Sequence, residues 1–320
     1  MKLFTKQIGL KLTVVILMCC LVTIVSCKKR KAFKQEDGQV LVDISTIRAN
    51  TDLVMAEAND VISGQFFLRG KPSGVGQELA SVGFSTCAML VDTSTIYAGK
   101  LTFNYTGNAC DNLKREGQVI VSIVNYPLKK WTDKGTVIKL EFVNYSSTDV
   151  TENKSIKING VEYITNESGG TWYELRYLNQ ANVVNSISGD ALKVIFDKTT
   201  SFTYSVARRI TYTIKGSVIS ASSVGIASQN NNSNVDCWGV TREDMDYSNQ
   251  IETAILWNTT CTSIKPLSGE AIVKVNGKYF DLKALYGIDA DGNASTANCA
   301  YGYKVSWSYK NSSRQRIFNY

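Results

Sequence analysis

Lys100-Leu101-Thr102-Phe103-Asn104-Tyr105 alternates polar and apolar side chains, and a period of two is the pattern of a strand with one buried face. The same alternation predicts four further strands, at residues 118–123, 137–142, 171–177 and 209–214. Turn signals separate the strands at Asn159-Gly160, Gly169-Gly170, Ser188-Gly189-Asp190, Asn276-Gly277 and Asp291-Gly292. Many short strands with such turns predict an all-β fold, either an antiparallel sandwich or a related layered β fold.

A short N-terminal helix is predicted before the strands, over residues 43–64. Asp43 or Ser45 can cap its start, and Gly64 offers its end. Apolar residues recur between them at roughly a 3.6-residue spacing, namely Ile44, Ile47, Val54, Met55, Ala58, Val61 and Ile62. We expect one apolar stripe of this helix to pack on the sheet.

The β domain is expected to fill residues 65–320. A chain of 320 residues, of which 44% are apolar and 10% aromatic, can bury a substantial core in one large domain or two small ones. A faint repeat favours two similar halves, at about 80–215 and 216–320. In each half a cysteine, a pair of strands, a second cysteine and a further strand follow in the same order.

The cysteines of this repeat predict two disulfides. Cys87 would bond to Cys110 in the first half, and Cys261 to Cys299 in the second, if the chain folds in an oxidising compartment. Cys237 would then remain unpaired and open to alkylation. The alternative is a bond between Cys237 and Cys261, which lie close in the sequence.

The N-terminus has the layout of a bacterial lipoprotein signal. A basic start precedes the apolar run of residues 12–25, and Val25-Ser26-Cys27 closes it. We therefore predict a signal peptide at residues 1–26, lipidation at Cys27 and a basic tether at 27–42. The alternative is a membrane span, for which the 14-residue run is short of the roughly 20 residues needed. A reversed anchor that holds the domain in the cytosol is a further alternative, because the basic residues Lys28 to Lys31 follow the apolar run and cytoplasmic flanks normally carry the excess of positive charge.

Charge decides which partners the folded part can take. The formal net charge is +7, but residues 1–34 hold eight Lys or Arg and no acid, so the remainder carries 7 − 8 = −1. Nucleic-acid binding needs a basic footprint on the domain itself, and we expect none. The basic tether is either in contact with anionic head groups or a solvated spacer.

Several short blocks together resemble one family. They are Phe84-Ser85-Thr86-Cys87, the strand at 102–107 before Cys110, the block at 111–119, Gly135-Thr136-Val137-Ile138 and Phe142-Val143-Asn144-Tyr145. In this order they resemble uncharacterised secreted lipoproteins of Bacteroidota, over about residues 43–310. The resemblance implies a lipid-anchored all-β domain without an assigned activity. Lys28 to Lys31 replace the acidic residues expected after the lipidated cysteine of a surface-exposed member, which favours the periplasmic face of the outer membrane.

Motifs for catalysis and metal binding are broken or missing. The chain has no histidine, which excludes histidine-dependent triads and dyads, and it has no CxxC pair for zinc. Gly70-Lys71-Pro72-Ser73 lacks the residue order of a phosphate loop. Asp289, Asp291 and Asn293 have the spacing of calcium ligands, but the glycine is misplaced and the closing glutamate is absent. We predict no catalytic residues, no metal and no cofactor.

A polar tract at residues 225–250 interrupts the strand periodicity. Such a tract is too long for a hairpin loop, and long loops are usually functional or disordered. We predict that it forms a variable binding edge with Trp238, Glu243, Asp244 and Asp246. The expected function is non-enzymatic binding or scaffolding in the cell envelope, with an envelope protein or a glycan as partner. The alternatives are a glycan-binding accessory lipoprotein that uses Trp131, Trp172, Trp238 and Trp257, and an enzyme of unknown type.

Overall fold

The computed structural model describes residues 38–65, 68, 89–110, 112–229, 231–261, 265–278, 280–309 and 312–320. The predicted signal peptide, Cys27 and the tether up to residue 37 lie outside the described residues. The first described element is helix α2 (Gln39–Gly64), and the short helices η2 (Ile96–Ala98) and α4 (Trp172–Tyr177) follow later. The strands are β1 (Met89–Asp92), β2 (Lys100–Cys110), β3 (Leu113–Ile123), β4 (Thr136–Asp149), β5 (Lys154–Asn166), β6 (Val183–Phe196), β7 (Thr200–Lys215), β8 (Val218–Gly225), β9 (Ala227–Gln229), β10 (Asn232–Val240), β11 (Asp246–Asn258), β12 (Ser268–Val275), β13 (Leu282–Ile288), β14 (Gly302–Tyr309) and β15 (Ser312–Asn319).

All the strands belong to one antiparallel sheet, in which most neighbours in the sequence are also neighbours in space. The order is β1-β2-β3-β4-β5-β6-β7-β10-β11-β12-β13-β14-β15. β8 and β10 both lie between β7 and β11, each pairing with a different part of those two strands. The predicted all-β class with an N-terminal helix is confirmed.

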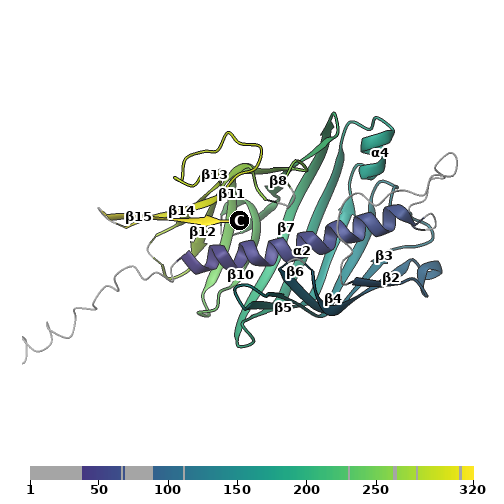
Figure 1. Ribbon diagram of the computed structural model, residues 1–320, viewed down its shortest axis with the longest axis horizontal. Helices are drawn as coiled ribbons and strands as arrows, with labels where there is room; N and C mark the ends of the chain where they lie inside the picture. The colour runs from purple at the N-terminus through teal and green to yellow at the C-terminus, as the bar shows by residue number, and fades with distance from the viewer. Residues whose placement is uncertain are drawn as a thin grey trace, which may run out of the picture. The chain divides into compact units, whose positions relative to one another are not determined.

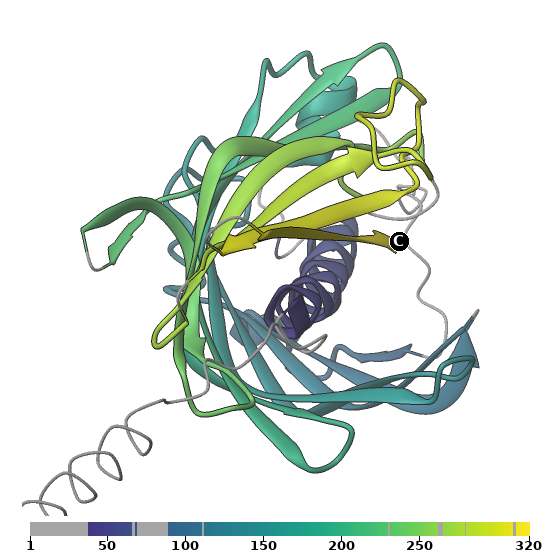
Figure 2. The same cartoon turned by 90° about the vertical axis from the view of Figure 1, so that its left-hand side faces the viewer.

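The sheet curves around α2, so that its walls cover the helix from several sides (Figures 1 and 2). Figure 2, which looks along the helix, shows the strands as an incomplete ring that is open on one side. Within the part of the chain that the structure describes, no pairing joins β1 to β15. The layers are therefore opposite walls of one sheet around a helix.

Bulges inside the long strands accompany this curvature. The predicted turns at Asn159-Gly160 and Ser188-Gly189-Asp190 are wrong, because both lie inside strands, β5 and β6, where the register shifts. A bulge places an extra residue in one strand and increases the local twist and bend. The predicted turns at Gly169-Gly170 and Asn276-Gly277 are confirmed, and Gly169, Gly170 and Gly277 have positive φ.

Helix α2 starts four residues earlier than predicted and is buried on more than one stripe. Gly38 is its N-cap residue and makes no side-chain cap. Neither Asp43 nor Ser45 caps the helix, because both lie inside it, and the Asp43 carboxylate bonds to Arg242. The predicted end at Gly64 is confirmed. The less buried positions Val42, Thr46, Ala49 and Leu53 follow one another at helical spacing, which places them on a single stripe.

The predicted strand at 171–177 is wrong, because Trp172–Tyr177 forms helix α4. A capping box starts the helix: the Thr171 hydroxyl accepts the Tyr173 N–H at 3.2 Å, and the Glu174 carboxylate accepts the Thr171 N–H at 2.8 Å. Tyr173 and Tyr177 lie one turn apart, with ring centroids separated by 5.0 Å. Apolar alternation over seven residues did not outweigh this helix-start signal.

The polar tract at 225–250 is not a long loop, contrary to the prediction. β8, β9, β10 and β11 take up most of it. Asn231 and Asn234 adopt φ of 64° and 57°, a left-handed conformation that asparagine tolerates better than most residues. β9 and β10 form a hairpin that leaves the sheet on the left of Figure 2. Asn231 and Asn234 therefore allow the backbone to reverse in this part of the chain.

Residues 38–320 form one compact unit. No break in the sheet separates the two predicted halves, because β7, which ends at Lys215, pairs directly with β8 and β10. A likeness between the halves stays a prediction.

Candidate functional site

Among the residues that the structure describes, four ion pairs join α2 to the surrounding sheet. Each links a charged helix residue to a partner on a strand or turn: Asp43 with Arg242, Arg48 with Asp236, Asp52 with Arg208, and Glu57 with Arg115. We call these the α2 ion pairs. Because each helical residue turns about 100°, Arg48 and Asp52 project to one side of the helix, and Asp43 and Glu57 to nearly the opposite side. Charge is thus paired on two sides of the helix.

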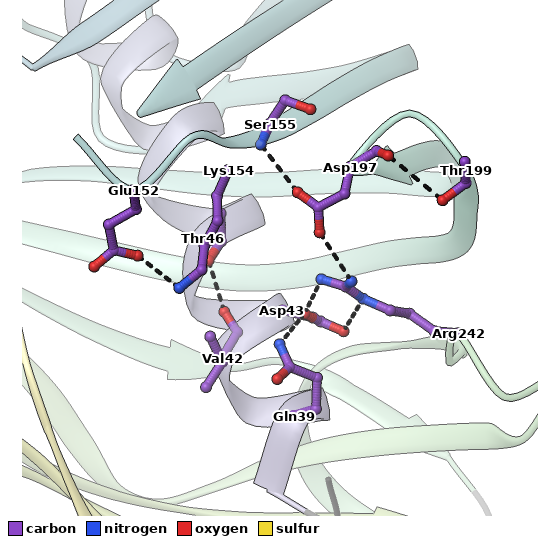
Figure 3. Close-up of polar contacts among 10 residues, drawn as sticks. All are labelled: Gln39, Val42, Asp43, Thr46, Glu152, Lys154, Ser155, Asp197, Thr199 and Arg242. Atoms are coloured by element: carbon purple, nitrogen blue, oxygen red, sulfur yellow. Dashed lines mark hydrogen bonds and ion pairs between the residues drawn. The ribbon is translucent and has the colours of Figure 1, made fainter. Parts of the chain in front are cut away.

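Arg242 ties the start of α2 to two strand turns, as Figure 3 shows. Its Nε and Nη2 donate to the two carboxylate oxygens of Asp43 at 2.8 and 2.6 Å, and its Nη1 lies 3.5 Å from Asp197. The guanidinium also stacks 4.0 Å from the centroid of the Phe196 ring. Burial raises the pKa of Asp43, and the bonds from Arg242 oppose that rise. Arg242 therefore stabilises the charged form of a desolvated carboxylate.

Two arginine pairs lie deeper, in the middle of the helix. Nη2 of Arg48 donates to Asp236, whose other oxygen accepts the Asn249 amide at 2.6 Å. Arg208 bonds to Asp52 through both of its terminal nitrogens. Burial by itself lowers the pKa of Arg48, but the charge of Asp236 and smaller contributions from Tyr204, Cys237 and Tyr286 together raise it. Both arginines stay charged, and each holds a strand of the sheet against the helix.

Glu162 on β5 lies near the Arg208 pair. Its side chain is 2% exposed, and burial raises its pKa to about 8, with the Arg208 charge opposing the rise and the Asp52 charge adding to it. Arg208 donates both of its hydrogen bonds to Asp52. Because Glu162 receives none of them, burial favours its neutral, protonated form. Glu162 is therefore a buried acid that changes charge near physiological pH.

The last of the α2 ion pairs, Glu57 with Arg115, lies in the C-terminal half of the helix. Arg115 forms a fork to Glu57 at 2.7 and 3.0 Å, and the Tyr105 hydroxyl donates to the same carboxylate at 2.7 Å. Two residues after Glu57, the Asn59 side chain accepts the Trp131 indole N–H at 2.9 Å. Polar groups of α2 thus find partners along its whole length.

The residues predicted as a binding edge lie on or beside the β10–β11 hairpin. Trp238 is half-buried in β10, opposite Ser205 and Ser248. Glu243, Asp244 and Asp246 are exposed at the turn, where Glu243 lies 3.4 Å from Lys278. The structure brings the three acids together but leaves Trp238 further along the strand. Their binding role stays a prediction.

The disulfide between Cys261 and Cys299 is confirmed, with Cα atoms 5.6 Å apart. Cys110 is disulfide-bonded, but Cys87 lies outside the described residues, so their pairing stays a prediction. Cys237 is unpaired, as predicted, but it is fully buried on β10 beside Arg48. Burial raises the pKa of its thiol. The prediction that it is open to alkylation is therefore wrong for the folded protein.

The tryptophans considered for glycan binding do not gather on one exposed face. Trp131 and Trp257 are buried, and Trp172 packs edge-on against Tyr212 with ring centroids 5.4 Å apart. The exposed large apolar side chains lie elsewhere. Among the described residues, four of the five most exposed lie in the loops 93–99, 124–135 and 167–182, and they are Leu128 at 88%, Tyr97 at 74%, Leu178 at 58% and Tyr177 at 57%.

We call these three loops together the loop end; α4, which belongs to the third, lies at the upper right of Figure 1. The Ile123 N–H donates to the Gly99 carbonyl at 2.9 Å, and the Gly170 N–H to the Thr132 carbonyl at 2.9 Å. The Asn166 amide bonds to the carbonyls of Trp131 and Gly170, both at 2.7 Å. A shallow polar depression of about 590 Å³ lies between two of the loops, with Lys129, Lys134, Ser168 and Gln180 in its lining.

The charged core residues were not selected from the sequence, although a signal was available. Arg48, Asp52 and Glu57 interrupt the apolar pattern of the helix without defining a separate polar face. A helix with charged residues on several sides and apolar residues between them needs oppositely charged partners from elements on each of those sides. Among the described residues, no group of three or more Cys, Asp or Glu is arranged to hold a metal ion. Nor does any described helix have the length and apolar character needed to cross a membrane.

Comparison with family models, curated proteins and solved structures finds no match to the chain.

Proposed function

We propose that the protein is a non-enzymatic binding or scaffolding component of the bacterial cell envelope, anchored through lipid on Cys27 and contacting its partner through the loop end. The exposure of Leu128, Tyr97, Leu178 and Tyr177 at the loop end carries the proposal. Large apolar side chains that concentrate at one end of a domain indicate a contact surface there, even where they stand on separate loops.

The occupied interior of the sheet favours a partner contact elsewhere on the protein. α2 occupies the concave side, and its carboxylates at 43, 52 and 57 are each bonded to an arginine. A carboxylate held by a guanidinium fork is stabilised as the anion and is a poor general base. This arrangement suits a scaffold whose interior holds the fold together.

The anchor follows from Val25-Ser26-Cys27 and is tested separately. Replacing Cys27 with Ser should abolish labelling by a fatty-acid analogue and move the protein from the outer-membrane fraction to the soluble periplasm. The same label on wild type and variant, or no label on the wild type, would contradict the anchor.

The binding surface is tested by site-specific crosslinking in intact envelopes. A photoreactive phenylalanine analogue at position 128 should give adducts with an envelope component. The matched control carries it at Val150, an exposed residue in the turn between β4 and β5. Equal adduct yields at the two positions would show that the loop end has no special partner.

A further inference from the structure

We propose that the loop end docks on the surface of an anionic lipid bilayer, with Leu128 and Tyr97 entering the interface and the lysines of residues 129–134 meeting lipid phosphates. The inference rests on the proposed function for the end that binds, and it adds the chemical class of the partner.

Leu128 is held at the apex of a fixed loop. The Tyr126 N–H donates to the Ile123 carbonyl at 3.4 Å, and the Lys129 N–H to the Asn125 carbonyl at 3.1 Å, so the chain reverses around Leu128. The Tyr126 side chain lies against Gly99, where a Cβ would come within 2.5 Å of it. Gly99 also has φ of 72°, a conformation that favours glycine. This contact joins the Leu128 loop to the loop of Tyr97.

The charge around Leu128 is positive. Residues 124–135 contain three lysines and one acid, Asp133, whose carboxylate accepts the Lys130 N–H at 2.8 Å. The Lys129 ammonium donates to the Lys134 carbonyl at 2.9 Å, which leaves its charge in place, and the Lys130 ammonium lies 4.0 Å from the centroid of the Tyr126 ring. An apolar tip with lysines beside it complements an anionic interface, because lysine stems can follow the apolar layer while their ammonium groups reach phosphate.

The acids of the neighbouring loop do not cancel this charge. The Glu174 carboxylate is buried and bonds to Thr171 at the start of α4. The Glu167 carboxylate is occupied by Arg209, with bonds of 2.8 and 3.1 Å. The acids of residues 167–182 therefore leave the positive charge of residues 124–135 in place.

The arrangement of the apolar residues favours a bilayer over a protein partner. Tyr97, Leu128 and the Tyr177-Leu178 pair sit on three different loops, and the polar depression separates the second loop from the third. The core of a protein interface is a continuous, well-packed apolar patch. Separate tips that carry Tyr and Leu can instead enter a lipid interface independently, and tyrosine is enriched at that depth.

Full-length protein reconstituted into vesicles tests the inference, with the photoreactive analogue at position 128 or at position 150. The vesicles contain either phosphatidylcholine alone or phosphatidylcholine mixed equally with phosphatidylglycerol. The N-terminal segment is the same in all samples, so differences report the folded domain. We expect lipid adducts at position 128 in the anionic vesicles, with a yield about tenfold above that at position 150. Lys129→Gln with Lys130→Gln should lower the yield at position 128 by about tenfold.

Three results would overturn the inference: no lipid adduct at position 128, equal yields at positions 128 and 150, or equal yields in the neutral and anionic vesicles. A protein adduct at position 128 in intact envelopes, without a lipid adduct in vesicles, would overturn the lipid partner and leave the proposed binding surface standing. Equal adducts at 128 and 150 in envelopes would remove the proposed function itself.

Discussion

The surroundings of α2 and the loop end invert the usual distribution of polar and apolar groups. Around α2, four ion pairs lie mostly buried inside the sheet. At the loop end, the side chains of Leu128 and Tyr97 are largely exposed. Buried charge is costly and is retained where it fixes one arrangement, whereas exposed apolar groups are retained where they meet a partner. We infer from this difference that the α2 ion pairs fix the arrangement of helix and sheet and that the loop end contacts a partner.

The largest expected effect comes from breaking a buried pair on one side only. Arg208→Met leaves the Asp52 carboxylate buried without its partner and close to Glu162. It should lower the free energy of unfolding by about 3 to 5 kcal/mol in urea titrations. The matched double variant Arg208→Met with Asp52→Leu removes both charges and should recover most of the loss. A double variant as unstable as the single one would mean that the arginine acts by packing instead of charge.

Glu162 should make stability depend on pH. Its pKa is about 8 in the folded protein and near 4.5 when unfolded, so the folded state binds the extra proton between these values. The free energy of unfolding should fall by about 2 to 4 kcal/mol as the pH rises from 5 to 9. Glu162→Gln should flatten this slope, which chemical denaturation at a series of pH values measures. Glu141→Gln is the control at a more exposed carboxylate, and a slope unchanged in Glu162→Gln would show that another group titrates.

Arg242 tests the edge of the buried region, where solvent already reaches part of the side chain. Arg242→Ala should cost about 1 to 3 kcal/mol, because Asp43 stays buried and loses both bonds. Arg242→Lys restores the positive charge without the bidentate hydrogen bonds to Asp43 and should recover only part of the loss. Thermal unfolding of the three proteins gives the comparison. Full recovery by lysine would show that charge alone matters at this position.

The smallest effect on stability is expected at the loop end. Leu128→Asp removes no buried contact, so it should change the free energy of unfolding by less than about 0.5 kcal/mol. Val150→Asp serves as the control, since it makes the same kind of change at another exposed turn. A loss near that of Arg242→Ala would mean that Leu128 packs in the fold and would weaken its assignment to a partner.

The sequence predicted the elements whose pattern is local. The strand at 100–105 is confirmed within β2, because its polar and apolar residues alternate without interruption. The helix at 43–64 is confirmed in nature and in its end, because its apolar spacing and Gly64 are also local signals. Gly160 and Gly189 carried a turn signal that tertiary structure used for bulges, since a glycine permits both.

What could not be predicted depends on residues distant in the sequence. Asp43 and Arg242 are 199 positions apart, and Arg48 and Asp236 are 188 apart, so no periodicity relates them. The polar tract at 225–250 was interpreted as a loop because it is rich in asparagine and lacks alternation; in β10 the consecutive residues Val235, Asp236 and Cys237 are all buried, at a shift of register. The loop end was missed because exposure of Leu128 follows from how the loops pack, not from their composition.

One crosslinking measurement in intact envelopes tests most directly whether the loop end is the contact surface. The photoreactive analogue is placed at Tyr97, and its adduct yield is compared in otherwise wild-type protein, in Leu128→Asp and in Val150→Asp. A shared contact surface predicts a loss of about tenfold in Leu128→Asp, because the neighbouring loop no longer enters the partner, and no change in Val150→Asp. Equal yields in all three proteins would contradict the account, because Tyr97 and Leu128 would then not share a partner.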